Sequence, residues 1–445
     1  MSNLLSIFIF WGLLAHGVFL PLAAVAQPSV EIDLTRETRR EVAIAVPEFV
    51  PEKETPQAAQ WGGKARRILE NDLRLSELFL LVEPDAYDQL ARQEAGLTKI
   101  DYAAWSGLGA QWVIKTQFKL SADNKSAIFV FRLYDAANQR FLVGKRYHAN
   151  LSLLRRVVHR FADEVVAHLT GKPGLAGTRI AFTAGAGGNK EVYIVDFDGH
   201  GMRKLTNDKS LAITPAWDPA GRRIVFTSYV NNNPDLIMID LVRRKRWAVL
   251  KLPGLNAAPA WSPDGSQIAL VLSKDGNSEI YVLNKNSTLK RLTHHYNIDT
   301  SPDWSPDGKK IVFASDRSGT GAPQIYIMDA AGDEGAVKRI SFDSSYNDNP
   351  AWSPDGDKIA YASRVGKRFQ IKMYNVEKEK TEIFTSGPGS GEEPSWSPDG
   401  RFIVYRRASG GKKWIEIKRV GGNRVRRLAN LPGDSYNPAW SPYLK

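Results

Sequence analysis

The sequence predicts a two-domain α+β protein, in which an N-terminal α/β domain is followed by a six-bladed β-propeller. Three observations predict it. A Pro-x-Trp motif occurs six times in the second part of the chain, four strand-like segments fill each interval, and the part before the first motif shows helix and strand patterns without a repeat. The chain has 445 residues, of which 43% are hydrophobic and 24% charged, so both domains can bury a core.

The repeated motif is usually Pro-x-Trp-Ser-Pro-Asp-Gly, and its tryptophans follow one another at intervals of 43 to 48 residues. The six are Trp217, Trp261, Trp304, Trp352, Trp396 and Trp440. This period is typical of propeller blades, each of which is a sheet of four antiparallel strands. We expect the tryptophans to fill the wedges between neighbouring blades, because aromatic side chains bury large areas.

Each period holds four segments with strand character. Pro-x-Trp is the first, and the glycine of the following turn supplies the positive φ of a tight reversal. A β-branched and aromatic run such as residues 268–270 is the second, an alternating run such as 279–282 is the third, and a short basic run such as 290–293 is the fourth. Charge on the outermost strand discourages pairing with other chains.

The two ends of the repeat region predict how the ring closes. The first unit, residues 179–206, lacks its Pro-x-Trp segment, and the last unit has only Pro438-Ala439-Trp440 and a short tail. The two fragments sum to one blade. We therefore expect the C-terminal strand to pair with the first three strands, so that the ring has six blades.

The segment before the repeats predicts an α/β domain over residues 27–169, followed by a Pro/Gly-rich linker over 170–177 and the propeller over 178–445. Strands are expected at 30–34, 41–46, 112–120, 127–134 and 141–147. Helices are expected at 57–82, with a break at Gly62-Gly63 as an alternative, and at 87–92 and 153–169.

Residues 1–26 predict a signal peptide and hence export. Residues 4–26 are almost wholly apolar without Lys, Arg, Asp or Glu, and they end in an A-x-A cleavage pattern at Ala24-Val25-Ala26. A membrane anchor is the alternative, because the run approaches spanning length. Residues 1–10 carry no basic side chain, which departs from the usual signal peptide.

The sequence predicts neither an enzyme nor a cofactor or metal site. It has no cysteine, no H-E-x-x-H motif and no G-x-S-x-G motif, and its Asp-rich turns lack the ligands of a calcium loop. The adjacent His294-His295 are interpreted as exposed loop residues. The net charge of +12 favours acidic partners, and we expect protein rather than nucleic acid, because an exported protein rarely meets the latter. A propeller-type hydrolase and a polyanion-binding propeller remain alternatives.

The remaining candidate for function is one mouth of the propeller channel. In a four-stranded meander, the loop before each Pro-x-Trp strand lies at the same end as the loop between the second and third strands. Loops on a rigid scaffold are common binding sites. The candidate binding residues there are Asn256, Ala258, Asp299, Thr300, Asn347, Asp348, Glu392 and Glu393.

The signal, the α/β domain and the six Pro-x-Trp units, four of which read Pro-x-Trp-Ser-Pro-Asp-Gly, together resemble the TolB family of the Tol-Pal system. The chain end Pro438-Ala439-Trp440-Ser441-Pro442-Tyr443-Leu444 and residues 256–273 are also similar to that family. The resemblance covers residues 27–445. It implies a periplasmic protein that is not an enzyme and that supports outer-membrane integrity and constriction of the outer membrane at division.

The resemblance also implies two partners. Pal, the peptidoglycan-associated lipoprotein, would bind at the channel mouth, including Leu255 to Ala258 and Thr300, although the family would be expected to have a polar residue at Leu255. TolA would bind the mature N-terminal arm. The implied arm residues are Gln27, Val30, Glu31, Ile32, Asp33 and Leu34. A monomer that reaches the outer membrane through Pal is expected.

Overall fold

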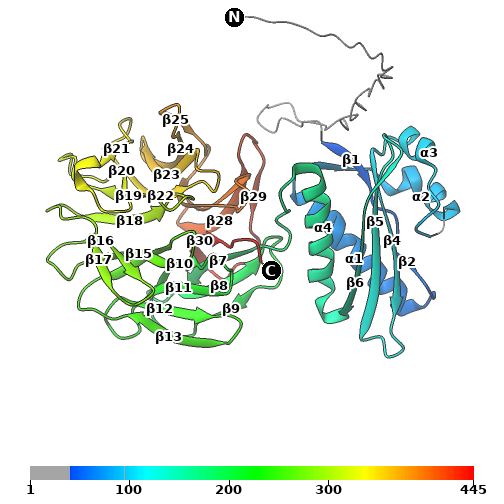
Figure 1. The fold of residues 1–445 in the computed structure, drawn as a ribbon, viewed down its shortest axis with the longest axis horizontal. Coiled ribbons are helices and arrows are strands. Elements are labelled where there is room, and N and C mark those ends of the chain that lie inside the picture. The colour runs from blue at the N-terminus through cyan, green and yellow to red at the C-terminus, as the bar shows by residue number, and fades with distance from the viewer. Residues whose placement is uncertain (1–40, 95, 445) are drawn as a thin grey trace, which may run out of the picture. The chain divides into compact units, whose positions relative to one another are not determined.

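The computed structural model describes residues 41–94 and 96–444 (Figure 1). The predicted signal peptide, the strand expected at 30–34 and the predicted N-terminal arm lie outside these residues. No helix among the described residues combines the length and apolarity that crossing a membrane requires.

The first part of the described chain is a mixed six-stranded sheet with helices on both faces. Its strands are β1 (Val42–Ala45), β2 (Val50–Pro51), β3 (Phe79–Leu81), β4 (Trp112–Leu120), β5 (Ser126–Asp135) and β6 (Arg140–Asn150). Their order is β3-β1-β4-β5-β6, and β2 also pairs with β4. The helices are α1 (Pro56–Leu75), α2 (Pro84–Gln93), α3 (Tyr102–Gly107) and α4 (Leu154–Thr170), the last preceded by the 3₁₀ turn η1 (Leu151–Leu153).

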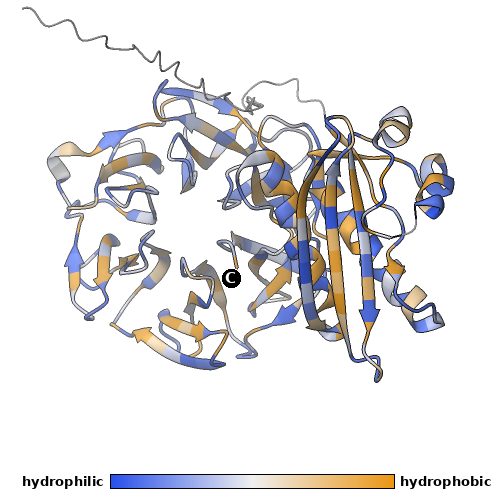
Figure 2. Ribbon diagram, turned by 45° about the vertical axis from the view of Figure 1, so that its right-hand side comes forward, coloured by the Kyte–Doolittle hydropathy of each residue, from blue (hydrophilic) through white to orange (hydrophobic). Residues whose placement is uncertain are grey.

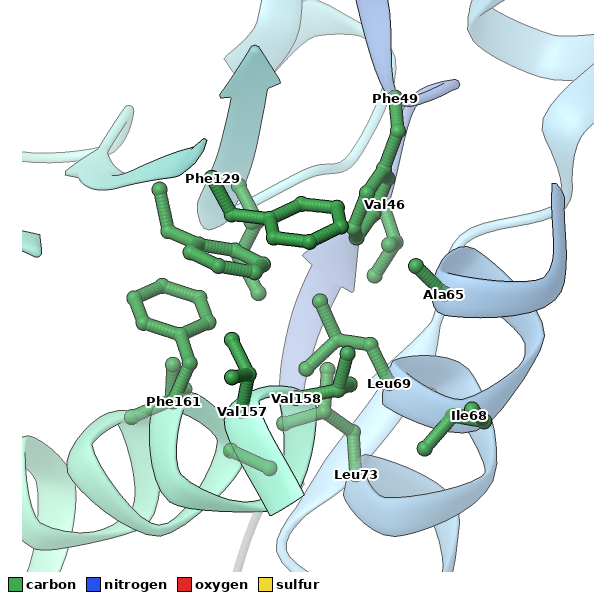
Figure 3. Close-up of a cluster of buried hydrophobic side chains, with 14 of the residues drawn as sticks. Val46, Phe49, Ala65, Ile68, Leu69, Leu73, Phe129, Val157, Val158 and Phe161 are labelled. Carbon is green, nitrogen blue, oxygen red and sulfur yellow. The ribbon is translucent and has the colours of Figure 1, made fainter. Parts of the chain in front are cut away.

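Two cores form because successive strand residues point to opposite faces of the sheet. On one face, α1 and α4 bury Leu69, Leu73 and Phe161 against Phe129 and other residues of β5 (Figure 3). On the other face, Trp105 of α3 lies against Tyr87 of α2, with the ring centroids 5.4 Å apart. The α/β layer prediction is confirmed.

Most predicted elements of this part are confirmed, but the helix expected at 57–82 is wrong at its end. The helix α1 ends at Leu75, Glu77 adopts a left-handed φ of 54°, and residues 79–81 form β3, which pairs in parallel with β1. The alternative of a break at Gly62-Gly63 is also wrong, because α1 continues through both glycines. The short helix α3 was not predicted.

The second part of the chain consists of six four-stranded antiparallel sheets arranged around a common axis (Figure 2). One sheet contains β10 (Ala212–Trp217), β11 (Arg223–Ser228), β12 (Asp235–Asp240) and β13 (Lys245–Leu250). The next contains β14 (Asn256–Trp261), β15 (Gln267–Leu272), β16 (Glu279–Asn284) and β17 (Leu289–Arg291). A third contains β18 (Asp299–Trp304), β19 (Lys310–Ser315), β20 (Gln324–Asp329) and β21 (Lys338–Arg339), and the 3₁₀ turn η2 (Glu334–Ala336) precedes β21. A fourth sheet contains β22 (Asn347–Trp352), β23 (Lys358–Val365), β24 (Arg368–Asn375) and β25 (Lys380–Ile383). A fifth contains β26 (Ser390–Trp396), β27 (Phe402–Ser409), β28 (Lys412–Arg419) and β29 (Val425–Arg427).

The sixth sheet joins the two ends of the repeat region, as predicted. Its order is β30-β7-β8-β9, from β30 (Asp434–Trp440), β7 (Arg179–Gly185), β8 (Glu191–Asp196) and β9 (Arg203–Lys204). The backbone N–H of Arg179 donates to Ser441 Oγ at 2.9 Å, and the N–H of Ser441 donates to the Arg179 carbonyl at 2.8 Å. The six-bladed ring closed by its C-terminal strand is therefore confirmed.

Candidate functional site

The expected mouth exists as a set of loops that hydrogen-bond to one another. The N–H of Asp299, at the start of β18, donates to the carbonyl of Ser278 in the β15–β16 loop at 2.9 Å. The N–H of Asp316, in the β19–β20 loop, donates to the Ile298 carbonyl at 3.3 Å. The loops before the inner strands thus lie beside the loops between second and third strands, on one face of the propeller.

Every inner strand is bulged at the residue that precedes its proline. These residues have left-handed φ values between 46° and 58°, and pairing with the second strand is interrupted there. They are Thr214, Ala258, Ser301, Asn349, Glu393 and Asn437. Because proline has no N–H to give to the ladder, the bulge costs no further hydrogen bond at that position. All six residues line the central channel, a cavity of about 370 Å³.

Three of the predicted mouth residues are fully buried and hold the loops in place. The Asn256 amide donates to the Leu252 carbonyl at 2.7 Å, Asp299 accepts from Arg317 at 2.6 Å, and the Asn347 amide donates to Gln324 Oε1 at 2.8 Å. These contacts position the neighbouring residues. The predicted residues that are partly exposed, and so can face a partner, are Leu255, Ala258, Thr300, Asp348, Glu392 and Glu393.

Three carboxylates gather on one side of the mouth, from β22 and β26. Glu392 and Glu393 share one cation, because Arg406 of β27 lies 2.6 Å from Glu392 Oε2 and 3.0 Å from Glu393 Oε1. Asp348 accepts from the Ser301 hydroxyl at 3.2 Å. Burial raises the pKa of Asp348 and of Glu393, although Arg406 opposes the rise at Glu393. A further cation would therefore stabilise the ionised groups.

The loops before β18 and β22 expose large apolar side chains that the sequence analysis did not select. Tyr296 is 85% exposed, Ile298 is 52% exposed, and both lie in the loop before β18. Phe342, in the corresponding loop before β22, is 73% exposed. Alignment of the six units on their prolines would have shown Phe342 at a position where the other five blades are polar.

A second cluster of functional groups lies away from the mouth. Among the residues that the structure describes, Asp72, His159 and Asp198 place potential metal ligands within 4.8 Å of one another. His159 Nδ1 already contacts Asp72 Oδ2 at 2.6 Å, and Arg155 pairs with Asp198. A metal ion would compete with both ion pairs, and the expectation of no metal site stays a prediction.

Two protein-family models match this chain. Residues 166–444 match the family model described as the TolB beta propeller domain, and residues 30–142 match the TolB amino-terminal domain. The Tol-Pal system protein TolB of Syntrophotalea carbinolica is 37% identical over 191 residues, which are 42% of this chain and 44% of that protein. The protein of the same name from Geobacter sulfurreducens is 38% identical over 152 residues, 34% of each chain.

The matched segments span less than half the length of these two relatives. The fold likeness extends further. The crystal structure of TolB from Acinetobacter baumannii matches with a TM-score of 0.77 and 28% identity, covering 91% of this chain and 97% of that chain. Since the propeller match alone includes more than half of the residues, the chain belongs to the TolB family.

Proposed function

We propose that this protein is a periplasmic, non-enzymatic scaffold of the Tol-Pal system. It binds the lipoprotein Pal at the channel mouth and TolA through residues 27–34, and it thereby supports outer-membrane integrity and constriction of the outer membrane at division. Its domains are a signal peptide over 1–26, an α/β domain over 27–169, a linker over 170–177 and the propeller over 178–445. It acts as a monomer without a cofactor.

The observation that carries the proposal is the bulged ring of inner strands. Six left-handed residues, one from each blade, line a channel within a closed ring, and the loops beside them are fixed by backbone hydrogen bonds. A rigid, concave surface of this kind binds a folded protein at low cost in ordering. Membership of the TolB family and the relatives' place in the Tol-Pal system support Pal as the partner.

Bulky substitutions at the mouth test the Pal site. Ala258→Trp and Thr300→Trp should weaken binding of the soluble domain of Pal from the same organism by at least about tenfold, because a large side chain keeps the surfaces apart. Calorimetry measures the dissociation constant. Val242→Trp is the control, because this 70% exposed residue lies in the β12–β13 turn at the other end of the blade. Equal binding by all three variants would refute the site.

Deletion of residues 27–34 tests the TolA site independently. The shortened protein should lose binding to the soluble C-terminal part of TolA and keep its affinity for Pal. Retained TolA binding would contradict the assignment of the arm.

The two alternatives predict other results. A polyanion-binding propeller would retain heparin in a strongly salt-dependent manner, even after the mouth substitutions. A hydrolase would release product from an envelope extract without either partner.

A further inference from the structure

Equivalent positions around the mouth differ in chemistry from one side of the ring to the other. Four residues before the proline, four successive blades carry an apolar or aromatic residue and the other two a polar one. The residues are Leu211, Leu255, Ile298 and Tyr346, against Ser390 and Asp434. Two residues before the proline, the first two blades carry Ile213 and Ala257, whereas the fourth and fifth carry Asp348 and Glu392. The mouth is therefore two-sided.

The apolar side, which we define as Leu255, Tyr296 and Ile298, presents its largest group to solvent. Tyr296 is 85% exposed, so its ring adds little to the packing of the fold. The ring stacks on His295, with centroids 4.4 Å apart and an interplanar angle of 28°. An exposed aromatic ring held by a neighbour is typical of the side chains that dominate protein interfaces.

The loop that carries Tyr296 is fixed by side chains of its neighbours. The Asn277 amide donates to the carbonyls of His295 and Asn297, both at 2.8 Å, and the N–H of Ile298 donates to Asp316 Oδ1 at 2.8 Å. A partner would thus meet a preformed surface, and little entropy would be lost in ordering it.

The acidic side, which we define as Asp348, Glu392 and Glu393, has more carboxylates than cations paired with them. Three carboxylates lie near one guanidinium, that of Arg406. Glu393 also accepts the N–H of Asn437 at 2.6 Å, and Asp348 accepts that of Asn349 at 2.6 Å. These neutral donors leave the negative charge in place. A lysine or arginine from a partner would complete the pairing.

We infer that the mouth accepts a folded protein in one orientation only, with an apolar patch of the partner over Tyr296 and Ile298 and a basic side chain of the partner over Asp348, Glu392 and Glu393. The inference rests on the proposed function, since it describes how the Pal-binding mouth recognises its partner. The two sides lie on different blades, so a partner that is turned about the channel axis would place its apolar patch against carboxylates. Burial of unpaired charge would then oppose binding.

Substitutions on each side test the two contacts with the soluble domain of Pal from the same organism as the probe. Tyr296→Ser should weaken binding about tenfold or more at all salt concentrations, because it removes apolar contact area. Glu392→Gln should weaken binding mainly at low salt, because it removes a charge that solvent screens. Val242→Ser, an exposed apolar residue at the other end of the propeller, is the matched control and should bind as the unsubstituted protein does.

Site-specific cross-linking tests the single orientation. A photoreactive residue at position 296 should label an apolar segment of Pal, and one at position 392 should label a different segment that contains Lys or Arg. Labelling of the same mixture of segments from both positions would overturn the inference.

The results separate this inference from the proposed function. If the unsubstituted protein does not bind Pal, both fall. If it binds Pal, and Tyr296→Ser and Glu392→Gln both bind Pal as well as the unsubstituted protein does, the two-sided mouth is wrong and the proposed function is retained. A dimer of this chain that depends on Tyr296, seen by light scattering in place of Pal binding, would also overturn the inference.

Discussion

At the scale of single residues, three of the inner-strand tryptophans connect their blades to the preceding blade by hydrogen bonds. The indole N–H groups of Trp217, Trp304 and Trp396 donate to backbone carbonyls of the preceding blade at 3.0 to 3.1 Å. In each case the acceptor is the residue between proline and tryptophan in the preceding motif. The side chains are buried between neighbouring sheets. The expected wedge role of the tryptophans is thus confirmed.

Replacement of one of these tryptophans should lower the stability of the fold. Trp304→Ala should lower the free energy of unfolding by about 3–5 kcal/mol, because it leaves a cavity among Val271, Ile311 and Phe313 and a carbonyl without its donor. Urea unfolding measures the loss. Trp247→Ala on the outer strand β13, where the side chain is 43% exposed, should cost less than about 1 kcal/mol. Equal losses would contradict the wedge role.

A buried histidine makes the stability depend on pH. Burial alone would lower the pKa of His159, but the hydrogen bond and the charge of Asp72 outweigh it, so the pKa is raised. Asp198 raises this pKa further and Arg155 opposes it. A raised pKa means that the stabilisation is present below the unfolded value of about 6.5 and is lost as pH rises through the folded pKa.

We therefore expect the free energy of unfolding to fall as pH rises above about 6.5, and His159→Gln to make that fall shallower. Burial raises the pKa of Asp163 to about 7, and its contribution is also lost with rising pH, so part of the slope should remain in the variant. Urea unfolding at several pH values measures the slope. An unaltered slope in His159→Gln would contradict this assignment.

At the scale of elements, α1 shows how neighbouring glycines can have different roles. A Cβ on Gly62 would lie 3.2 Å from the Phe118 ring and 3.2 Å from the Phe49 carbonyl, whereas a Cβ on Gly63 would meet only the end of Arg67 at 3.5 Å. Gly62 therefore permits the close approach of α1 to β4. Gly63 has no such role and only lowers the helix propensity.

Alanine at Gly62 and alanine at Gly63 should change the free energy of unfolding in opposite directions. Gly63→Ala should raise the free energy of unfolding by about 0.5–1 kcal/mol through helix propensity. Gly62→Ala should lower it by about 1–3 kcal/mol, because the added methyl group overpacks the core. Thermal unfolding of both variants checks the pair, and stabilisation by both substitutions would show that α1 does not approach β4 so closely.

At the scale of the whole molecule, the propeller ring is closed by strand pairing and not by a covalent bond. Strand β30 supplies the inner strand of the sheet that also contains β7. The Trp440 indole donates to Thr178 Oγ1 at 3.0 Å, and its ring lies 5.5 Å from that of Phe197. Without β30, the edge of β7 would be open to pairing with other chains.

Deletion of residues 436–445 should therefore open the ring. We expect the melting temperature to fall by about 10 °C or more, or the protein to become insoluble, because the loss of Trp440 alone removes a buried aromatic side chain. Calorimetry and solubility measurements check this. Deletion of Lys445 alone is the control, and an unchanged melting temperature after the longer deletion would show that β30 does not close the ring.

Several features could be predicted from local pattern alone. The period of the Pro-x-Trp motif predicts the number of blades, because each unit repeats the same four strand-like segments. The end of α1 could not be predicted in this way. Residues 79–81 are apolar and suit a helix or a buried strand equally, and their parallel pairing with β1 decides between the two.

The features of the binding mouth can likewise be separated into those that the sequence predicts and those that it does not. By itself the sequence determined the blade count, the closure of the ring and the face on which the mouth lies, since these follow from the spacing and order of repeated segments. Only the tertiary structure decided that Asn256, Asp299 and Asn347 are buried supports while Tyr296 and Ile298 face solvent. The physical reason is that the exposure of a loop side chain depends on hydrogen bonds between loops distant in sequence, such as those of Asn277, which no local periodicity records.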